Sequence, residues 1–208
     1  MNPVSPLIHL VDDDAAVREA LALLLGTVGL RVQAWGDPRQ FLDGFDRRSI
    51  GAIVLDVRMP GLSGLTVIDL LREQGSDLPV VVLTGHGTVE MCRRAFKSGA
   101  AEFLEKPIDD ERLLEAVHNA VRTHVLSRER EAAGREARER YATLSPRERE
   151  VLALVVEGLT NKEVGRSLGM SPRTVETHRA NLSHKLQVST LAQLIRGYAA
   201  LVDEDRAP

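Results

Sequence analysis

Residues 7–14 read LIHLVDDD, an apolar run that ends abruptly in three aspartates. A short apolar run followed by charged residues predicts a buried strand and the turn after it. Neighbouring carboxylates repel one another and destabilise a folded chain unless their charge is compensated. A divalent cation can compensate it, because Mg²⁺ prefers oxygen ligands and binds through one or two carboxylates.

The remainder of residues 1–125 repeats this strand pattern, with segments of helical periodicity in between. The expected strands are residues 7–11, 30–34, 52–55, 79–83 and 102–104. The expected helices are residues 15–26, 38–46, 64–74, 88–98 and 109–125. Strands that alternate with helices indicate βαβ units and a parallel sheet that is covered on both faces.

Reactive side chains stand where several of these strands end. Asp12 and Asp13 follow the first strand, Asp56 the third and Thr84 the fourth, and Lys106 follows the fifth. Ligands of open parallel sheets bind beyond the carboxyl ends of the strands, so these side chains should converge. In such a cluster a carboxylate can attack phosphorus, while a metal ion and a lysine stabilise the transferring phosphoryl group.

Four motifs between residues 10 and 107 support this interpretation, namely LVDDD, LDVRMPGLSG, LTGHG and FLEKP. In order and spacing they resemble the receiver domain of two-component response regulators. The resemblance implies an α/β flavodoxin-like (βα)5 fold with strand order 2-1-3-4-5. It also implies that a sensor histidine kinase phosphorylates Asp56, and that Mg²⁺ or Mn²⁺ is the cofactor. The implied metal ligands are Asp12, Asp13, Asp56 and the backbone carbonyl of Arg58.

The same resemblance assigns three switch residues. Thr84 matches the hydroxyl that moves toward the phosphoryl group, Lys106 the lysine that pairs with a phosphoryl oxygen, and Phe103 the aromatic rotamer switch. The Lys106–Pro107 bond matches one that is usually cis in the family. Plainer readings remain for Thr84 as a strand residue and for Phe103 as core, and Asp14 is expected to cap the first helix.

Residues 125–142 have the composition of a linker, because charged residues and alanine make up almost all of SREREAAGREARERY. Pairs of opposite charge four residues apart, such as Glu131 with Arg135, predict a solvated helix. A weak coiled-coil seam is the alternative, and the glycine at position 134 disfavours it. We therefore expect a receiver domain at 1–124, a charged helical linker at 125–142 and a second domain at 143–208.

Four helices are expected in this second domain. Ser145-Pro146 begins the first, Thr160 with Glu163 forms a capping box for the second, and Ser171-Pro172 begins the third. A fourth covers residues 191–201. Two helices joined by a tight turn that contains glycine form the helix-turn-helix pattern.

The motifs LSPRE, LTNKEV and SPRTVETHRANLSHKL resemble the LuxR/NarL-type DNA-binding domain. With the receiver in front, the whole chain is similar to the FixJ group of response regulators. The third helix would then enter the major groove of double-stranded promoter DNA. Base edges would be met by Glu176, Thr177 and Ala180. Phosphates would be met by Lys162, Arg173, Arg179 and Lys185, and the exposed Thr174 and Asn181 complete the expected contact set.

Composition agrees with an intracellular regulator. Of 208 residues, 43% are hydrophobic, which is enough for packed cores, and one cysteine excludes a disulfide framework within the chain. Neither a signal peptide nor an apolar run of about 20 residues is present, so we expect a cytoplasmic protein without membrane contact. Residues 1–123 hold 18 acidic and 13 basic residues, whereas residues 143–199 hold 5 and 8, which suggests modules with different partners.

These features predict a transcription factor that dimerises on phosphorylation, binds DNA and acts with RNA polymerase. It would not be an enzyme beyond self-catalysed phosphorylation and dephosphorylation of Asp56. One rival is a phosphatase of the haloacid dehalogenase type, which also uses an aspartyl nucleophile, but it leaves Asp56, Thr84 and the helix-turn-helix unexplained. Another rival is a constitutive DNA binder with a vestigial receiver, which the complete set of receiver residues disfavours.

Overall fold

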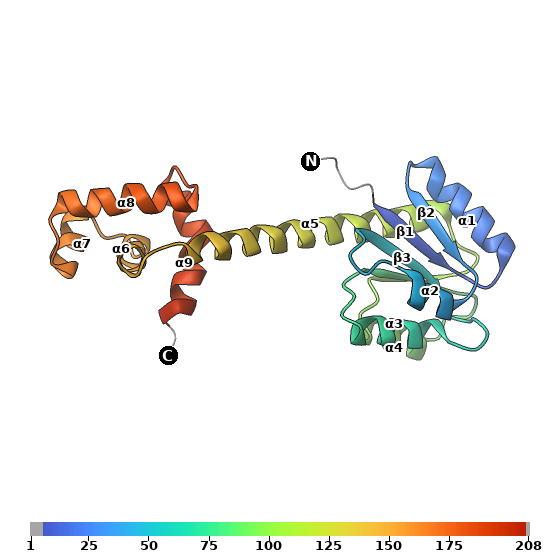
Figure 1. The fold of residues 1–208 in the computed structure, drawn as a ribbon. Coiled ribbons are helices and arrows are strands. Elements are labelled where there is room, and N and C mark those ends of the chain that lie inside the picture. The colour runs from blue at the N-terminus through green and yellow to red at the C-terminus, as the bar shows by residue number, and fades with distance from the viewer. Residues whose placement is uncertain (1–5, 207–208) are drawn as a thin grey trace. The chain divides into compact units, whose positions relative to one another are not determined.

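The computed structural model describes residues 6–206 of the chain. The chain divides into two compact units, of which the first ends at Arg128 and the second begins at Glu129. Figure 1 draws the helices and strands of both units.

Within the described residues of the first unit, five parallel strands form one sheet in the order β2-β1-β3-β4-β5. This confirms the predicted strand order. The strands are β1 (Leu7–Val11), β2 (Arg31–Trp35), β3 (Gly51–Asp56), β4 (Val80–Thr84) and β5 (Glu102–Glu105). The central strands β3 and β4 are buried along their whole length, as expected of strands covered on both faces.

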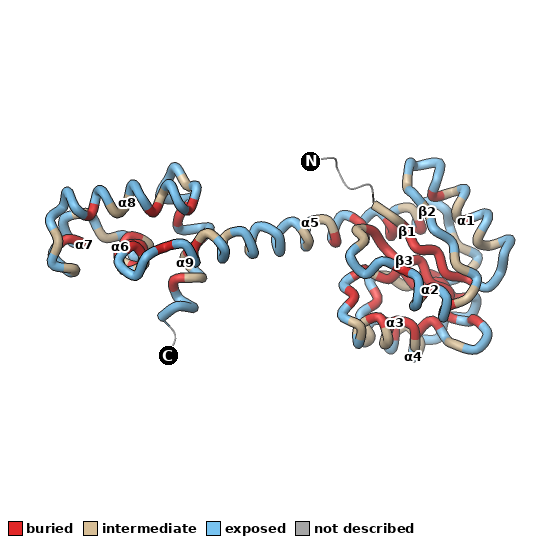
Figure 2. Tube along the Cα trace, viewed as in Figure 1, coloured by how far each residue is buried: buried red, intermediate tan, exposed pale blue. Residues whose placement is uncertain are grey.

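The helices of this unit pack on both faces of the sheet. They are α1 (Ala15–Thr27), α2 (Pro38–Gly44), α3 (Gly64–Glu73), α4 (Val89–Lys97) and α5 (Asp110–Ala142). Side chains of α2, α3 and α4 share one hydrophobic core with alternate strand residues. Side chains of α1 and α5 share another with the remaining strand residues. Figure 2 shows the buried positions concentrated along the strands and on one side of the helices.

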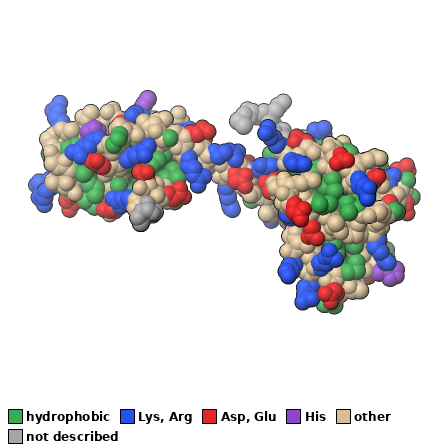
Figure 3. Space-filling view, turned by 60° about the horizontal axis from the view of Figure 1, so that its bottom comes forward, with side chains coloured by type: hydrophobic (Ala, Val, Ile, Leu, Met, Phe, Trp, Pro, Cys, Tyr) green, Lys and Arg blue, Asp and Glu red, His purple; other side chains and the backbone are tan. Residues whose placement is uncertain are grey.

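Helix α5 is longer than the predicted helix at 109–125, because it runs without a break from Asp110 to Ala142 and includes the expected linker. Proline, which would end a helix, is absent from this stretch. Arg140 pairs with Glu136 one helical turn away, as the charge spacing suggests. Acidic and basic side chains alternate along the exposed part of α5 (Figure 3).

The second unit is helical and has its own hydrophobic core. Its further helices are α6 (Pro146–Val156), α7 (Asn161–Leu168), α8 (Pro172–Leu186) and α9 (Leu191–Arg206). The capping box predicted at Thr160 forms, and Ser145, predicted as an N-cap, also forms a capping box with Glu148. The turn between α7 and α8 uses Gly169 in the left-handed conformation, at φ 66°. Helix α9 continues five residues beyond the predicted end at 201.

Among residues 6–206, no helix combines the length and apolar character needed to cross a membrane.

Candidate functional site

Of the acidic residues expected at the carboxyl edge of the sheet, Asp12 and Asp56 meet there at Lys106. Lys106 Nζ lies 2.7 Å from Asp12 Oδ2 and 2.8 Å from Asp56 Oδ1. Asp12 is 1% exposed and Asp56 5% exposed. Two buried carboxylates from different strands therefore share a single cation.

Strand register explains why the two carboxylates meet. Val11 of β1 lies opposite Leu55 of β3, so the residues that follow each of them emerge side by side. The backbone then holds each carboxylate, because Asp56 Oδ2 accepts from Arg58 N at 2.7 Å and Asp12 Oδ1 accepts from Asp14 N at 2.9 Å.

Close packing after β3 requires glycine at position 64. A Cβ on Gly64 would lie 2.2 Å from the backbone oxygen of Asp56, so only glycine allows α3 to begin against the end of β3. On the other side of the site, the Lys106–Pro107 peptide bond is cis. Lys106 N donates to Thr84 O at 2.7 Å, which ties the end of β5 to the end of β4.

Burial and hydrogen bonding act against one another in this cluster. Burial raises the pKa of the Asp56 carboxyl, and the hydrogen bond from Lys106 offsets only part of that effect. Burial also opposes the charge on Lys106, but its hydrogen bonds to Asp12 and Asp56 outweigh burial and raise the pKa of the amine. Lys106 therefore stays protonated and compensates the charge of Asp56, which burial disfavours.

Among residues 6–206, no three His, Cys, Asp or Glu side chains are arranged to bind a metal ion together. Asp13 is exposed, whereas Asp12 and Asp56 are buried. The available donors nevertheless fit Mg²⁺, which needs only one or two carboxylates and takes its other ligands from water and phosphate oxygens. The direct roles of Asp13 and of the Arg58 carbonyl stay predictions.

Thr84 is fully buried at the end of β4, and its hydroxyl is bonded to the following loop. Its Oγ1 accepts from His86 N at 3.3 Å and donates to His86 O at 3.4 Å. Phe103 is half-buried and packs against the core that α3 and α4 share. The switch roles of Thr84 and Phe103 stay predictions, whereas Asp14 caps α1 as expected and accepts from Ala16 N.

Contacts of the loop after β4 include two residues that sequence reasoning missed. Gly87 N donates to Glu105 Oε1 at 3.1 Å, across 18 residues of sequence. A Cβ on Gly87 would lie 3.2 Å from Cε1 of Phe103, so the loop and the aromatic ring are in close packing. The LTGHG motif alone could have suggested a tight loop, but the partner carboxylate follows only from the β4–β5 pairing.

In the second unit, the predicted DNA contacts lie on the exposed side of α8 and on α7. Val175, Leu182 and Leu186 of α8 are buried in the core. Of the residues predicted to contact DNA, Arg179 is half-buried. The others are exposed on α7 and α8: Lys162, Arg173, Thr174, Glu176, Thr177, Ala180, Asn181 and Lys185.

Several of these side chains already have partners within the unit. Lys185 Nζ lies 2.7 Å from the buried Glu148 Oε2, and Arg179 donates to Asn161 Oδ1 at 2.9 Å. Burial raises the pKa of Glu148, but hydrogen bonds from Lys185 and Ser145 outweigh it and lower the pKa overall. Sequence reasoning missed the Glu148–Lys185 pair, because its members are 37 residues apart.

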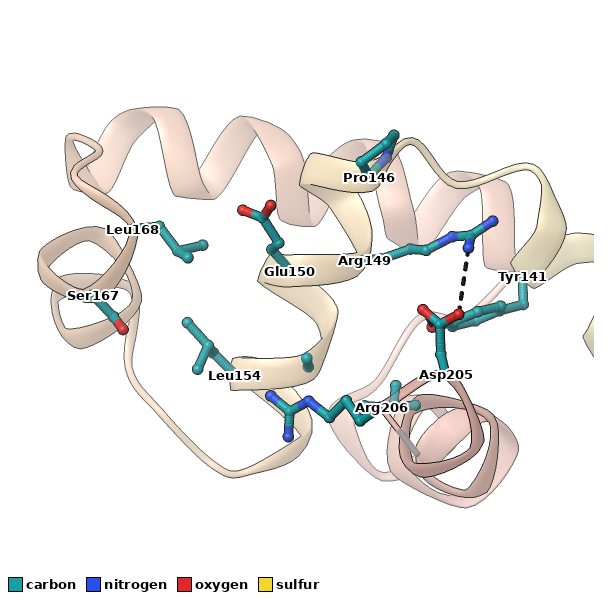
Figure 4. A pocket seen from close by; sticks show the side chains of 11 residues that line it. Tyr141, Pro146, Arg149, Glu150, Leu154, Ser167, Leu168, Asp205 and Arg206 are labelled. Atoms are coloured by element: carbon teal, nitrogen blue, oxygen red, sulfur yellow. Dashed lines mark hydrogen bonds and ion pairs between the residues drawn. The ribbon is translucent and has the colours of Figure 1, made fainter. Parts of the chain in front are cut away.

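A cavity of about 410 Å³ opens between the end of α5 and helices α6, α7 and α9 (Figure 4). On its wall Tyr141 donates to Asp205 at 3.1 Å, and Arg149 lies 3.6 Å from Asp205. Arg149 also stands 5.2 Å above the centre of the Tyr141 ring. The charges on this wall are paired with one another, and none of the residues predicted to contact DNA lines the cavity.

Comparisons with known proteins agree with this geometry. The chain matches the family model of the response regulator receiver domain over residues 8–118. It matches the model of bacterial regulatory proteins of the luxR family over residues 142–197. The fold and the acidic site thus define a response regulator with a DNA-binding output domain. This chain belongs to the FixJ-like response regulators, which join a receiver to a LuxR-type domain.

Similar proteins cover nearly the whole chain. The transcriptional regulatory protein FixJ of Bradyrhizobium diazoefficiens is 41% identical over 91% of this chain and 92% of its own. FixJ of Azorhizobium caulinodans is 45% identical over 93% of this chain and 92% of its own. The response regulator protein TodT of Pseudomonas putida is 37% identical over 98% and 89%.

Two solved structures extend the comparison. The response regulator StyR has a TM-score of 0.81 at 35% identity and covers 97% of this chain and 99% of its own. Full-length FixJ from B. japonicum has a TM-score of 0.60 at 38% identity and covers 99% and 100%. The chain is therefore a transcriptional response regulator and not an enzyme, and its domains imply a kinase and DNA as partners.

Proposed function

We propose that phosphoryl transfer to Asp56 switches this regulator between two states. A sensor histidine kinase donates the group, the phosphorylated chain dimerises, and the dimer binds double-stranded promoter DNA and acts with RNA polymerase. One observation carries the proposal: buried Asp56 shares Lys106 with buried Asp12 at the carboxyl edge of the sheet.

In this proposal a carboxylate oxygen of Asp56 attacks the phosphorus of a phosphohistidine on the kinase. A new O–P bond forms, the N–P bond breaks, and its electron pair stays on the histidine nitrogen, which yields an acyl phosphate on Asp56. Asp56 Oδ1 accepts from Lys106 and Oδ2 from Arg58 N before transfer, and each oxygen keeps a second lone pair with which it can attack. Lys106 then turns to an oxygen of the phosphoryl group.

Bound Mg²⁺ would supply charge neutralisation during transfer and would be held by Asp12, Asp13, Asp56 and the Arg58 carbonyl. The Thr84 hydroxyl would leave His86 for the phosphoryl oxygen, and Phe103 would follow into the vacated space. This motion biases an existing equilibrium between two states, and the shift in their populations is limited by a differential stabilisation of roughly 1–5 kcal/mol.

Asp56→Asn tests the proposal. The variant should remain folded, should gain no phosphoryl mass from acetyl phosphate with Mg²⁺, and should sediment as a monomer where wild type dimerises. Intact-protein mass spectrometry and sedimentation velocity measure the two effects. Asp43→Asn serves as the matched control, because Asp43 is exposed on α2.

Equal phosphorylation or equal dimerisation of wild type and Asp56→Asn would refute the proposal. A DNA affinity that acetyl phosphate leaves unchanged, in a wild-type chain that does become phosphorylated, would favour the constitutive DNA binder instead. Fluorescence anisotropy of a labelled duplex, recorded with and without acetyl phosphate, distinguishes the two functions.

A further inference from the structure

Arg18 reaches back from the first turns of α1 to the acidic site. Its Nη1 donates to the backbone oxygen of Asp12 at 2.7 Å. Its backbone N donates to Asp14 O at 3.0 Å, so the residue is anchored in the helix that Asp14 caps. The side chain therefore spans the turn that carries the three aspartates.

With Arg18 in place, every polar group of Asp12 has a partner. Asp12 N donates to Trp35 O at 3.2 Å, and its carboxylate accepts from Asp14 N and Lys106 Nζ. The oxygen that Arg18 binds belongs to the peptide unit between Asp12 and Asp13. Fixing that oxygen fixes the peptide plane from which the exposed Asp13 projects.

Gly36, which follows β2, provides the space for this contact. A Cβ at position 36 would lie 3.2–3.3 Å from three guanidinium atoms of Arg18, so the planar group lies against the glycine backbone. A planar guanidinium can occupy such a narrow space and still donate sideways, which a lysine ammonium cannot do. Arg18 and Gly36 thus form a matched pair.

We propose that Arg18 is a positioning residue that holds the Asp12–Asp13 peptide, and with it the Asp13 carboxylate, in the orientation that receives Mg²⁺. The inference rests on the proposed function of the acidic site. Groups that orient metal ligands in this way typically contribute 10- to 100-fold to metal affinity, in round numbers.

Titration of the full chain with Mg²⁺ alone tests the proposal, followed by the fluorescence of Trp35. This residue is the only tryptophan of the sequence, and its carbonyl is bonded to Asp12. Arg18→Lys and Arg18→Gln should each raise the Mg²⁺ dissociation constant by about tenfold. Gly36→Ala should raise the dissociation constant to a smaller extent, since the new methyl group pushes the guanidinium away from the glycine backbone. The exposed Arg39, replaced by Lys, is the matched control.

Thermal unfolding in excess EDTA separates positioning from general stability. The Arg18→Lys midpoint should match that of the Arg39→Lys control, while Mg²⁺ affinity differs. The double variant Arg18→Gln with Gly36→Ala should bind Mg²⁺ no more weakly than Arg18→Gln alone. Unchanged Mg²⁺ affinity in Arg18→Lys and Gly36→Ala, or fully additive losses in the double variant, would overturn the inference.

Failure of the proposed function gives a different pattern. A wild-type chain that does not bind Mg²⁺ would overturn both ideas. Weakened Mg²⁺ binding in the Arg18 variants, together with a wild-type chain that acetyl phosphate cannot phosphorylate, would support the positioning role and refute phosphoryl transfer.

Discussion

His9 of β1 is an ionisable side chain enclosed in a cluster of aromatic rings. It is 1% exposed and contacts the rings of Trp35, Phe41 and Phe45. Trp35 Nε1 donates to His9 Nδ1 at 3.3 Å. Because an indole nitrogen can only donate, Nδ1 must accept and Nε2 carries the proton of the neutral ring. The cluster therefore selects one tautomer and disfavours the charged form.

This enclosure predicts an acid-sensitive receiver. Burial lowers the pKa of His9 below the ordinary value of 6.5, although nearby Asp46 opposes the shift. The unfolded chain then binds a proton more readily than the folded one, so stability is lost as pH falls below 6.5. His9→Gln should weaken this dependence between pH 7 and pH 5, as measured by urea unfolding followed through Trp35 fluorescence. An unchanged dependence in the variant would assign it to other groups.

At the scale of the helices, the Glu148–Lys185 ion pair affects which side chains of α8 are available to contact DNA. It joins α8 to α6, and the Glu148 side chain is 6% exposed while that of Lys185 is 38% exposed. A lysine that neutralises a buried carboxylate is less free to contact a phosphate. The phosphate contact predicted for Lys185 thus competes with its ion pair to Glu148. The side chain of Arg173 is exposed and forms no ion pair of this kind among residues 6–206.

Two substitutions on α8 should therefore differ in DNA binding. Arg173→Ala should reduce the salt dependence of duplex affinity by about one phosphate contact. Lys185→Met should leave that slope nearly unchanged but cost about 2 kcal/mol of stability, because Glu148 stays buried without its partner. Fluorescence anisotropy at several salt concentrations measures the first effect and urea unfolding the second. A smaller slope for Lys185→Met than for Arg173→Ala would contradict this assignment.

At the scale of the whole molecule, the described residues contain separate hydrophobic cores on either side of the boundary after Arg128. The two units also carry their own spectroscopic reporters. The only tryptophan, Trp35, belongs to the first unit, and the only tyrosines, Tyr141 and Tyr198, belong to the second. Folding of each unit can therefore be followed in the intact chain.

Matched core substitutions should then act on one unit each. Leu25→Ala and Leu182→Ala each remove a buried leucine and should cost about 3 kcal/mol. The first should shift only the transition seen by tryptophan fluorescence, and the second only that seen by the near-ultraviolet circular dichroism of tyrosine. One common transition, shifted equally by both variants, would show that the units unfold together.

Periodicity within the sequence determined most of the fold. Each predicted strand begins within a residue of its observed start, and the caps at Asp14, Ser145 and Thr160 form as expected. Such features depend on neighbours in the chain, which a sequence displays directly. The full length of α5 was harder to predict. Charge pairs and alanine indicate a helix in the linker, but they do not indicate whether it is continuous with the helix before it.

The convergence of Asp12, Asp56 and Lys106 also followed from sequence, because parallel strands bring their carboxyl ends to one edge. Only the tertiary structure decided the partners of single atoms: Lys106 between two carboxylates, Glu148 with Lys185, and Arg18 on the Asp12 carbonyl. The members of such pairs are not related by any regular spacing in the sequence. Their distances depend on how helices and sheet pack, and packing is a property of the folded molecule.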